Sequence, residues 1–196
     1  MDSGRVATIA RKTRETDISL KMTLDGEGNF KGNTGVGFLD HMLELFARHG
    51  SFDMVIMAKG DLWVDHHHTV EDVGICLGAA IREALGDKKG INRYGNALIP
   101  MDEALVLVAL DISGRPYLET QLALPSSRVG DFDTELVEEF FRAFAVNAGV
   151  TLHIRQLAGK NTHHIIEAAF KGLGRSLKMA AALTGEKGVP STKGLL

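Results

Sequence analysis

The stretches HHHTVEDVGICLG, residues 66–78, and HHIIEAAFKGLG, residues 163–174, share the pattern His-His-x-x-Glu. On an α-helix each residue turns by about 100°, so the glutamate lies between two histidines that themselves point about 100° apart. Such a pair suits two neighbouring metal ions better than one ion, which is the arrangement of a dinuclear centre. The donors are His67, His68 and Glu71 in the first copy and His163, His164 and Glu167 in the second.

The similarity between the two halves extends upstream of the histidines. At an offset of 98 residues, FLDHMLELFARHG (38–50) aligns with LVEEFFRAFAVNA (136–148), matching a phenylalanine and an alanine and placing His41 on Glu139. The sequence therefore predicts an internal duplication. It also predicts one further metal ligand from each half, His41 and Glu139, because both are residue types that bind the same class of ion.

Each half is predicted to follow the order strand, strand, helix, strand, helix, with its helices on one face of a sheet. The alternating segment ISLKMTLD (18–25) is typical of a half-buried strand, and the offset of 98 aligns its leucines with those of PYLETQLAL (116–124). Residues 87–100, rich in Gly, Asn and charge, are expected to be a linker. The expected elements are 5–12, 17–25, 38–49, 52–59 and 67–86, then 104–112, 116–124, 133–148, 151–158 and 163–184. The expected divisions are a first α+β repeat (1–92), a second (93–184) and a C-terminal tail (185–196), within one compact domain.

The composition is that of an ordinary globular protein. Of 196 residues, 44% are hydrophobic, and the net charge of −3 with scattered Lys and Arg argues against a nucleic-acid partner. Cys76 is the single cysteine, which indicates a buried thiol in a reducing compartment. The chain lacks the apolar run of a secretory signal or the ~20 apolar residues of a membrane span, so we expect a cytoplasmic protein without a membrane partner.

The eight candidate ligands carry imidazole and carboxylate groups and no thiolate. Eight ligands suit two ions with about four each, which leaves coordination positions open for catalysis and allows Mn, Fe, Co, Ni or Zn. Arginines in loops shaped by Gly or Pro suit a phosphate group, which a guanidinium binds through two hydrogen bonds. The candidate phosphate residues are Arg93, Arg115, Lys171, one turn beyond Glu167, and Lys193 in the tail segment PSTKG.

Several segments together resemble the imidazoleglycerol-phosphate dehydratases of histidine biosynthesis over nearly the whole chain. They are FLDHMLELFARHG, DHHHTVEDVGICLG, SGRPYL, TLHIRQLAGKNTHHIIEA and the terminal PSTKG. The resemblance implies two superposable halves, each a four-stranded sheet with two helices, as in ribosomal protein S5 domain 2-like folds. It also implies a shell of 24 subunits built from trimers, with sites at subunit contacts.

The same resemblance implies the reaction, a dehydration of D-erythro-imidazoleglycerol phosphate to imidazole acetol phosphate. Two Mn(II) ions per site would bind the substrate ring as an imidazolate. By motif, the eight candidates become the ligands, Glu15 lies near the substrate, and Arg93, Arg115, Lys171, Ser191 and Lys193 surround the phosphate. We expect Glu15 to be the proton-transferring group, because the lone pairs of metal-bound carboxylates are occupied. The chain departs from the family at Glu139, where relatives often have histidine. Either Glu139 ligates through oxygen, or one ion has one ligand fewer; the internal alignment with His41 favours ligation.

Two other functions use the same ligand set. A non-enzymatic assembly protein would hold metals that join subunits and leave no coordination position open. A dinuclear hydrolase would cleave phosphate esters. Release of inorganic phosphate distinguishes the hydrolase from the dehydratase, and dissolution of the oligomer by chelators identifies the assembly protein.

Overall fold

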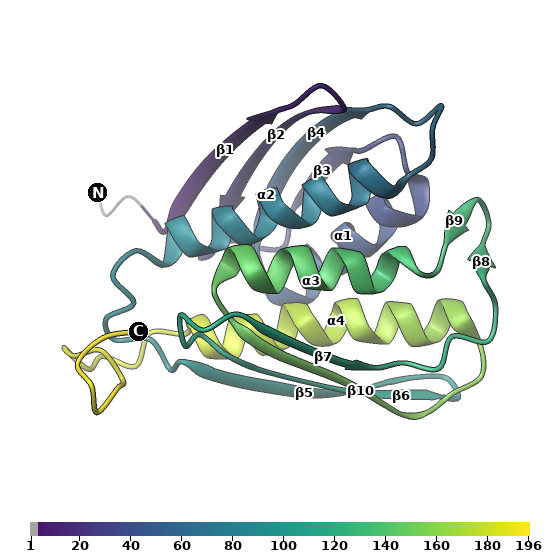
Figure 1. Cartoon of the computed structure of the whole chain (residues 1–196). Coiled ribbons are helices and arrows are strands. Elements are labelled where there is room, and N and C mark those ends of the chain that lie inside the picture. Colours follow the sequence, from purple (N-terminus) through teal and green to yellow (C-terminus); the bar gives the residue numbers. More distant parts are fainter. Residues whose placement is uncertain (1–3) are drawn as a thin grey trace.

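The computed structural model describes residues 4–196 and contains two units of the same plan. In the first unit, a four-stranded sheet in the order β1-β2-β4-β3 carries two helices on one face (Figure 1). β3 and β4 run parallel, whereas the other neighbours are antiparallel. The elements are β1 (Val6–Lys12), β2 (Thr16–Thr23), β3 (Phe30–Asn33), α1 (Gly37–Gly50), β4 (Asp53–Gly60) and α2 (His67–Leu85).

The second unit repeats this topology with the sheet order β5-β6-β10-β7, in which β7 and β10 are the parallel pair. A short hairpin of β8 and β9 precedes its first helix and has no counterpart in the first unit. The elements are β5 (Tyr94–Met101), β6 (Ala104–Asp111), β7 (Tyr117–Gln121), β8 (Arg128–Val129), β9 (Phe132–Asp133), α3 (Leu136–Ala148), β10 (Thr151–Ala158) and α4 (Thr162–Ala181).

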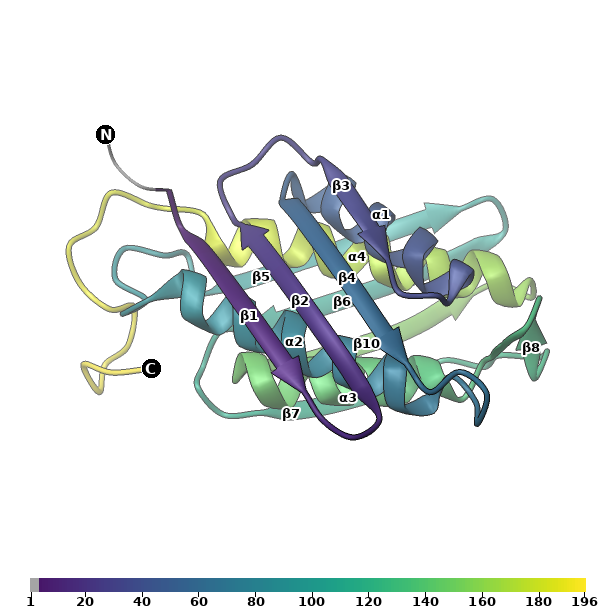
Figure 2. The same ribbon diagram turned by 90° about the horizontal axis from the view of Figure 1, so that it is seen from above.

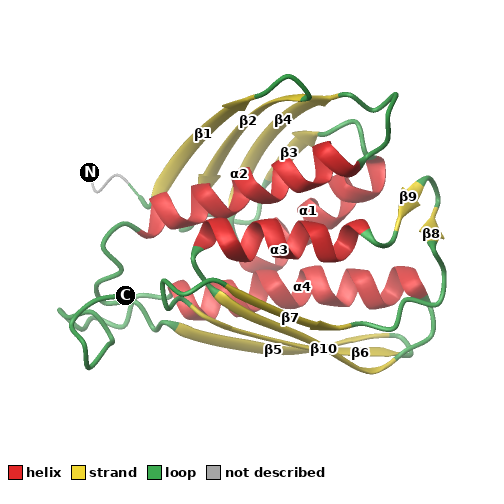
Figure 3. Cartoon of the chain, in the orientation of Figure 1, coloured by secondary structure: helices red, strands yellow, loops and turns green. Residues whose placement is uncertain are grey.

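The two sheets form the outer layers and the four helices lie between them (Figure 3). Seen from above, the first sheet lies over the second (Figure 2). α2 packs against α3 and α1 packs against α4, so the two main helix pairs each join one unit to the other. This arrangement brings a helix of each half next to a histidine-bearing helix of the other half.

The predicted duplicated α+β fold with two four-stranded sheets is confirmed, but one part of the internal alignment is wrong. An offset of 98 equates β2 with residues 116–124, whereas the structural counterpart of the central strand β2 is the central strand β6. The β8–β9 hairpin makes the segment between β6 and α3 longer than the segment between β2 and α1. An alignment without gaps therefore cannot match both the strands and the helices.

Besides the β8–β9 hairpin, two strands of the four-stranded sheets were missed by the sequence patterns. Residues 30–33 form the short edge strand β3, and the expected linker 87–100 contains most of β5. In β5 the inward positions are Gly95, Ala97 and Ile99, and Pro100 points outward. Small inward residues and a proline weaken the strand signal, and an edge strand tolerates the proline because its outer N–H groups need no ladder partner.

Two helix ends also differ from the prediction. α3 begins at Leu136 rather than residue 133, because Phe132 and Asp133 pair in β9. α4 ends at Ala181 rather than residue 184, because Leu183 forms an isolated bridge with Ile91. No helix within residues 4–196 is long and apolar enough to cross a membrane.

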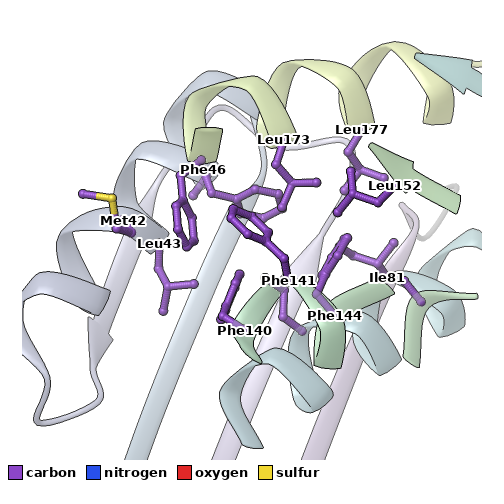
Figure 4. Packing of buried hydrophobic residues seen from close by; sticks show 14 of the residues in the cluster. Met42, Leu43, Phe46, Ile81, Phe140, Phe141, Phe144, Leu152, Leu173 and Leu177 are labelled. Carbon is purple, nitrogen blue, oxygen red and sulfur yellow. The ribbon is translucent and has the colours of Figure 1, made fainter. Parts of the chain in front are cut away.

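A single cluster of buried apolar side chains runs through both units. Phenylalanines from α1, α3 and α4 fill its centre: Phe46, Phe140, Phe141, Phe144 and Phe170 (Figure 4 labels the first four). Burying such side chains contributes about 1.5–3 kcal/mol each, so this cluster contributes much of the stability of the helix layer.

The helices approach most closely at glycines. A Cβ atom at Gly174 of α4 would lie 2.5 Å from the carbonyl oxygen of Phe46 in α1. At the matching place in the other pair, a Cβ atom at Gly78 of α2 would lie 2.6 Å from the carbonyl oxygen of Phe144 in α3. The same close approach therefore occurs in both helix pairs. It sets the position of α1 against α4 and of α3 against α2.

Cys76 is expected to be chemically inert in the native protein. Its side chain is fully buried, and burial raises the pKa of the thiol to about 11. Because the reactive species is the thiolate, which forms only as pH rises through that pKa, almost none is present at pH 8. We expect no reaction with a thiol-specific reagent at pH 8 until guanidinium unfolds the chain. One equivalent of rapid reaction in the folded state would contradict this.

Candidate functional site

Each histidine pair lies in the first turn of a long helix, where a preceding side chain accepts hydrogen bonds from its backbone. The Asn161 side chain accepts hydrogen bonds from the backbone N–H groups of His163 and His164, at 3.0 and 3.4 Å. Before α2, the Asp65 side chain accepts a hydrogen bond from the backbone N–H of His67 at 2.7 Å, although the N-cap residue itself is His66. These bonds satisfy helix N–H groups that have no partner inside the helix. Both first turns lie at the end of the molecule opposite the C-terminus (Figure 1).

One group of metal-binding residue types gathers between α1 and α4. Donor atoms of His41, His163 and Glu167 lie within 4.8 Å of one another, and no other such group of three occurs in residues 4–196. Nε2 of His41 is 3.7 Å from Oε1 of Glu167, and Nε2 of His163 is 3.8 Å from Oε2. The triad therefore combines His41 on α1, from the first half, with His163 and Glu167 on α4, from the second half.

The chemistry of this triad fits a divalent metal ion. Glu167 is only 7% exposed, and a buried carboxylate requires a cation or hydrogen-bond donors around it. Lys171 supplies one charge, with Nζ 3.1 Å from Glu167 Oε1. Burial lowers the pKa of His163, which favours the neutral imidazole that ligates metals. Two imidazoles and a carboxylate are ligands that Mn, Fe, Co, Ni and Zn accept.

The corresponding residues of the other helix pair are less closely gathered. Nε2 of His67 is 3.9 Å from Oε2 of Glu71, both on α2. Glu139 lies on α3, is partly exposed and lines a cavity of 430 Å³ between β7 and α3. Within residues 4–196, Glu139 does not join His67 and Glu71 in a group of three donors.

The second histidine of each pair binds a carboxylate through Nδ1. His68 Nδ1 is 2.9 Å from Asp61 Oδ2, and His164 Nδ1 is 2.8 Å from Glu103 Oε2. These hydrogen bonds raise the pKa of both histidines, and the pKa of Glu103 falls to about 2. On the opposite side, His68 Nε2 lies 3.8 Å from Glu15 Oε1.

Sequence reasoning missed Asp61 and Glu103. Asp61 follows β4, and Glu103 lies in the turn between β5 and β6, so neither has a fixed helical spacing to its histidine. Acidic residues in turns are too common to have singled them out.

Four of the five predicted phosphate-binding residues line a second cavity, of 740 Å³, beside the C-terminal tail. Arg93 is held there by a bidentate pair with Asp111, at 2.7 and 3.0 Å, and by a bond from Nη1 to the Pro190 carbonyl at 2.8 Å. Arg115 is 66% exposed, and its guanidinium lies 3.7 Å from Asp111 Oδ2. The four residues are Arg93, Arg115, Ser191 and Lys193.

The candidate metal ligands and this cationic cavity are far apart within one chain. The backbone N–H of Arg93 donates to Ala180 near the end of α4, whereas His164 lies at its start. The 16 residues from 164 to 180, at 1.5 Å each, span about 24 Å. Lys171 lies between them, and Glu15 lies beside His68. One chain therefore presents the predicted site in two separate parts.

The internally duplicated fold and the imidazole and carboxylate triad define an α+β protein with a candidate metal centre. A family model described as imidazoleglycerol-phosphate dehydratase matches residues 34–177, which is most of the chain. The chain belongs to the imidazoleglycerol-phosphate dehydratase family.

Individual relatives agree with this assignment. The imidazoleglycerol-phosphate dehydratase of Moorella thermoacetica is 61% identical over 194 residues, 98% of this chain and 99% of that protein. The enzyme of Desulforamulus reducens is 62% identical, with the same coverage. The crystal structure of the Staphylococcus aureus enzyme is 46% identical with a TM-score of 0.83 and covers 91% of this chain and 99% of that one. A Pyrococcus furiosus structure, in complex with (S)-C348, is 42% identical with a TM-score of 0.84, covering 96% and 100%.

Proposed function

We propose that the chain is a hydro-lyase that dehydrates D-erythro-imidazoleglycerol phosphate to imidazole acetol phosphate in histidine biosynthesis. The observation that carries this proposal is family membership over nearly the full chain, at about 60% identity to dehydratases. The triad of His41, His163 and Glu167 is consistent with the metal dependence of this family.

The finer proposal concerns the metal. Two Mn(II) ions per site, held by the eight candidate ligands, would bind the substrate's imidazole ring as an imidazolate and stabilise charge that develops as the hydroxyl leaves. The diverging directions within each histidine pair support ligation of two ions. Glu139 would ligate through oxygen.

The protein's own groups would then handle the proton and the phosphate. Glu15 is the proposed proton-transferring residue, because its exposed carboxylate lies beside His68 and is not among the candidate ligands. Arg93, Arg115, Lys171, Ser191 and Lys193 would bind the phosphate, and the tail 185–196 would close over it. Held by Asp111, Arg93 is oriented before the substrate arrives.

The proposed site requires more than one copy of the chain. A substrate of this size cannot span the roughly 24 Å between the start of α4 and the cationic cavity, as estimated from the helical rise. We therefore propose that neighbouring copies supply the two parts, in a cytoplasmic assembly of 24 subunits built from trimers. The exact number of subunits rests on the resemblance alone.

Product analysis tests the reaction. The purified protein, loaded with Mn(II) and given the substrate, should form a product that absorbs in the ultraviolet as an enolised ketone in alkali. No inorganic phosphate should appear. Stoichiometric release of phosphate would instead make the chain a metal-dependent hydrolase.

The Arg115→Ala substitution should weaken substrate binding more than turnover. Arg115 is exposed in the cationic cavity and lies 3.7 Å from Asp111, so its loss removes charge without disturbing the core. A charge-assisted bond contributes about 1.5–3 kcal/mol, so we expect KM to rise at least roughly tenfold with kcat nearly unchanged. Steady-state kinetics measure both constants, and Arg155→Ala, exposed on β10, is the control. A fall in kcat at constant KM would contradict a binding role.

A further inference from the structure

His68 and His164 donate the same hydrogen bond, from Nδ1, to carboxylates that are not equivalent in the duplicated fold. Asp61 follows β4, the third strand along the sheet order of its unit. Glu103 lies in the β5–β6 turn, whose counterpart in the first unit is the β1–β2 turn that carries Glu15. A contact inherited with the duplication would come from matching positions. The two carboxylates therefore reach the two Nδ1 atoms independently.

This hydrogen bond determines which ring nitrogen is free. An ionised carboxylate can only accept, so Nδ1 of each histidine carries the proton. In the neutral ring, Nε2 then presents its lone pair on the opposite side, as a metal ligand must. His163 and His67 have no such carboxylate on Nδ1 among residues 4–196 and lie nearest to glutamates through Nε2.

Backbone hydrogen bonds hold Glu103 in place, whereas Asp61 is enclosed by burial. Oε1 of Glu103 accepts the backbone N–H groups of Lys160 and Asn161, at 3.1 and 2.7 Å, which leaves Oε2 for His164. Asp61 is only 6% exposed, and its second oxygen, Oδ1, is buried without a hydrogen-bond partner in residues 4–196. An unpartnered buried oxygen costs about 1–3 kcal/mol, which stability alone does not explain.

We propose that Asp61 and Glu103 are positioning residues that fix His68 and His164 in the Nδ1-protonated tautomer and aim Nε2 at the metal ions. This inference rests on the proposed function, because it takes both histidines as ligands. Loss of such an outer carboxylate lowers metal affinity about 10- to 100-fold in other metal sites.

Glu103→Gln is the sharper test because it preserves the turn. The remaining amide oxygen can still accept from Lys160 and Asn161, while the amide N–H₂ group would face His164 and donate to Nδ1. The proton would then move to Nε2 and block ligation. We expect Mn(II) affinity, measured by electron paramagnetic resonance titration of the chelated and reloaded full-length protein, to fall about 10- to 100-fold. The unfolding midpoint of the metal-free variant should equal that of the wild type.

Asp61→Asn provides an independent second variant, and Asp17→Asn the matched control. Asp17 is exposed and, among residues 4–196, forms an ion pair only with Lys12 on the neighbouring strand, so its variant should bind Mn(II) like the wild type. Unchanged Mn(II) affinity in both Asp61→Asn and Glu103→Gln would overturn the proposal. A weaker affinity that appears only together with a lower metal-free unfolding midpoint would also overturn it, because the residues would then be structural.

The ligand variants separate this proposal from the proposed function. If His68→Ala and His164→Ala lose Mn(II) while the carboxylate variants retain it, only the positioning role fails. If His68→Ala and His164→Ala retain full Mn(II) affinity, the proposed ligand set fails and the positioning role with it.

Discussion

The Glu167→Gln protein should lose its metal and nearly all of its activity. Both oxygens of this buried carboxylate face imidazoles, with His41 at 3.7 Å and His163 at 3.8 Å. Glutamine keeps the size and one oxygen but removes the charge that a divalent ion requires in a buried site. Because an outer residue already costs about 10- to 100-fold in metal affinity, we expect a direct ligand to cost at least about 100-fold.

Metal content and activity should be measured together in this variant. Mn(II) per chain by elemental analysis should fall well below that of the wild type, and added Mn(II) should restore only part of the turnover. Glu83→Gln, exposed at the far end of α2, is the matched control and should behave like the wild type. A Glu167→Gln protein with full metal content would remove Glu167 from the ligand set. Normal turnover with metal depleted would remove the metal from the reaction.

The Gly174→Ala substitution should be strongly destabilising, against the usual trend for helices. In an exposed helix interior, alanine in place of glycine stabilises by about 1 kcal/mol. Here the added methyl group would lie 2.5 Å from the Phe46 carbonyl oxygen and 3.0 Å from the Gly50 nitrogen. Both are backbone atoms and cannot rotate away, so α1 and α4 must separate. Overpacking of this kind costs about 1–3 kcal/mol, which outweighs the helical gain.

The same displacement should reach the triad, because α1 carries His41 and α4 carries His163 and Glu167. We expect a loss of several degrees in Tm and weaker Mn(II) binding, measured by calorimetry and metal titration. Gly37→Ala, at the start of α1 with open space around the new methyl group, is the matched control. A Gly174→Ala protein as stable as that control would show that the helix pair adjusts without cost.

Features that depend on spacing within one helix were predictable from the sequence. The pairing of each glutamate with its histidines, and the divergence of the two histidines, follow from helical rotation, and the structure confirms that both patterns begin a helix. The duplicated fold was also predictable, because the repeat of 38–50 in 136–148 preserves the residues that pack between helices. The strands β3 and β5 were not predicted, because small residues and a proline replace the usual alternation of apolar residues there.

Contacts between distant segments could be learned only from the tertiary structure. No spacing along the chain says that α1 lies against α4, and so that His41 meets Glu167 of the other half. Nor does spacing reveal that Asp61 and Glu103 reach Nδ1 atoms, or that four candidate phosphate-binding residues gather far from the candidate metal ligands. The physical reason is that helical periodicity orients side chains over one or two turns. Which turns face each other is decided by how the whole core packs, and here that packing is limited by glycines at two helix crossings.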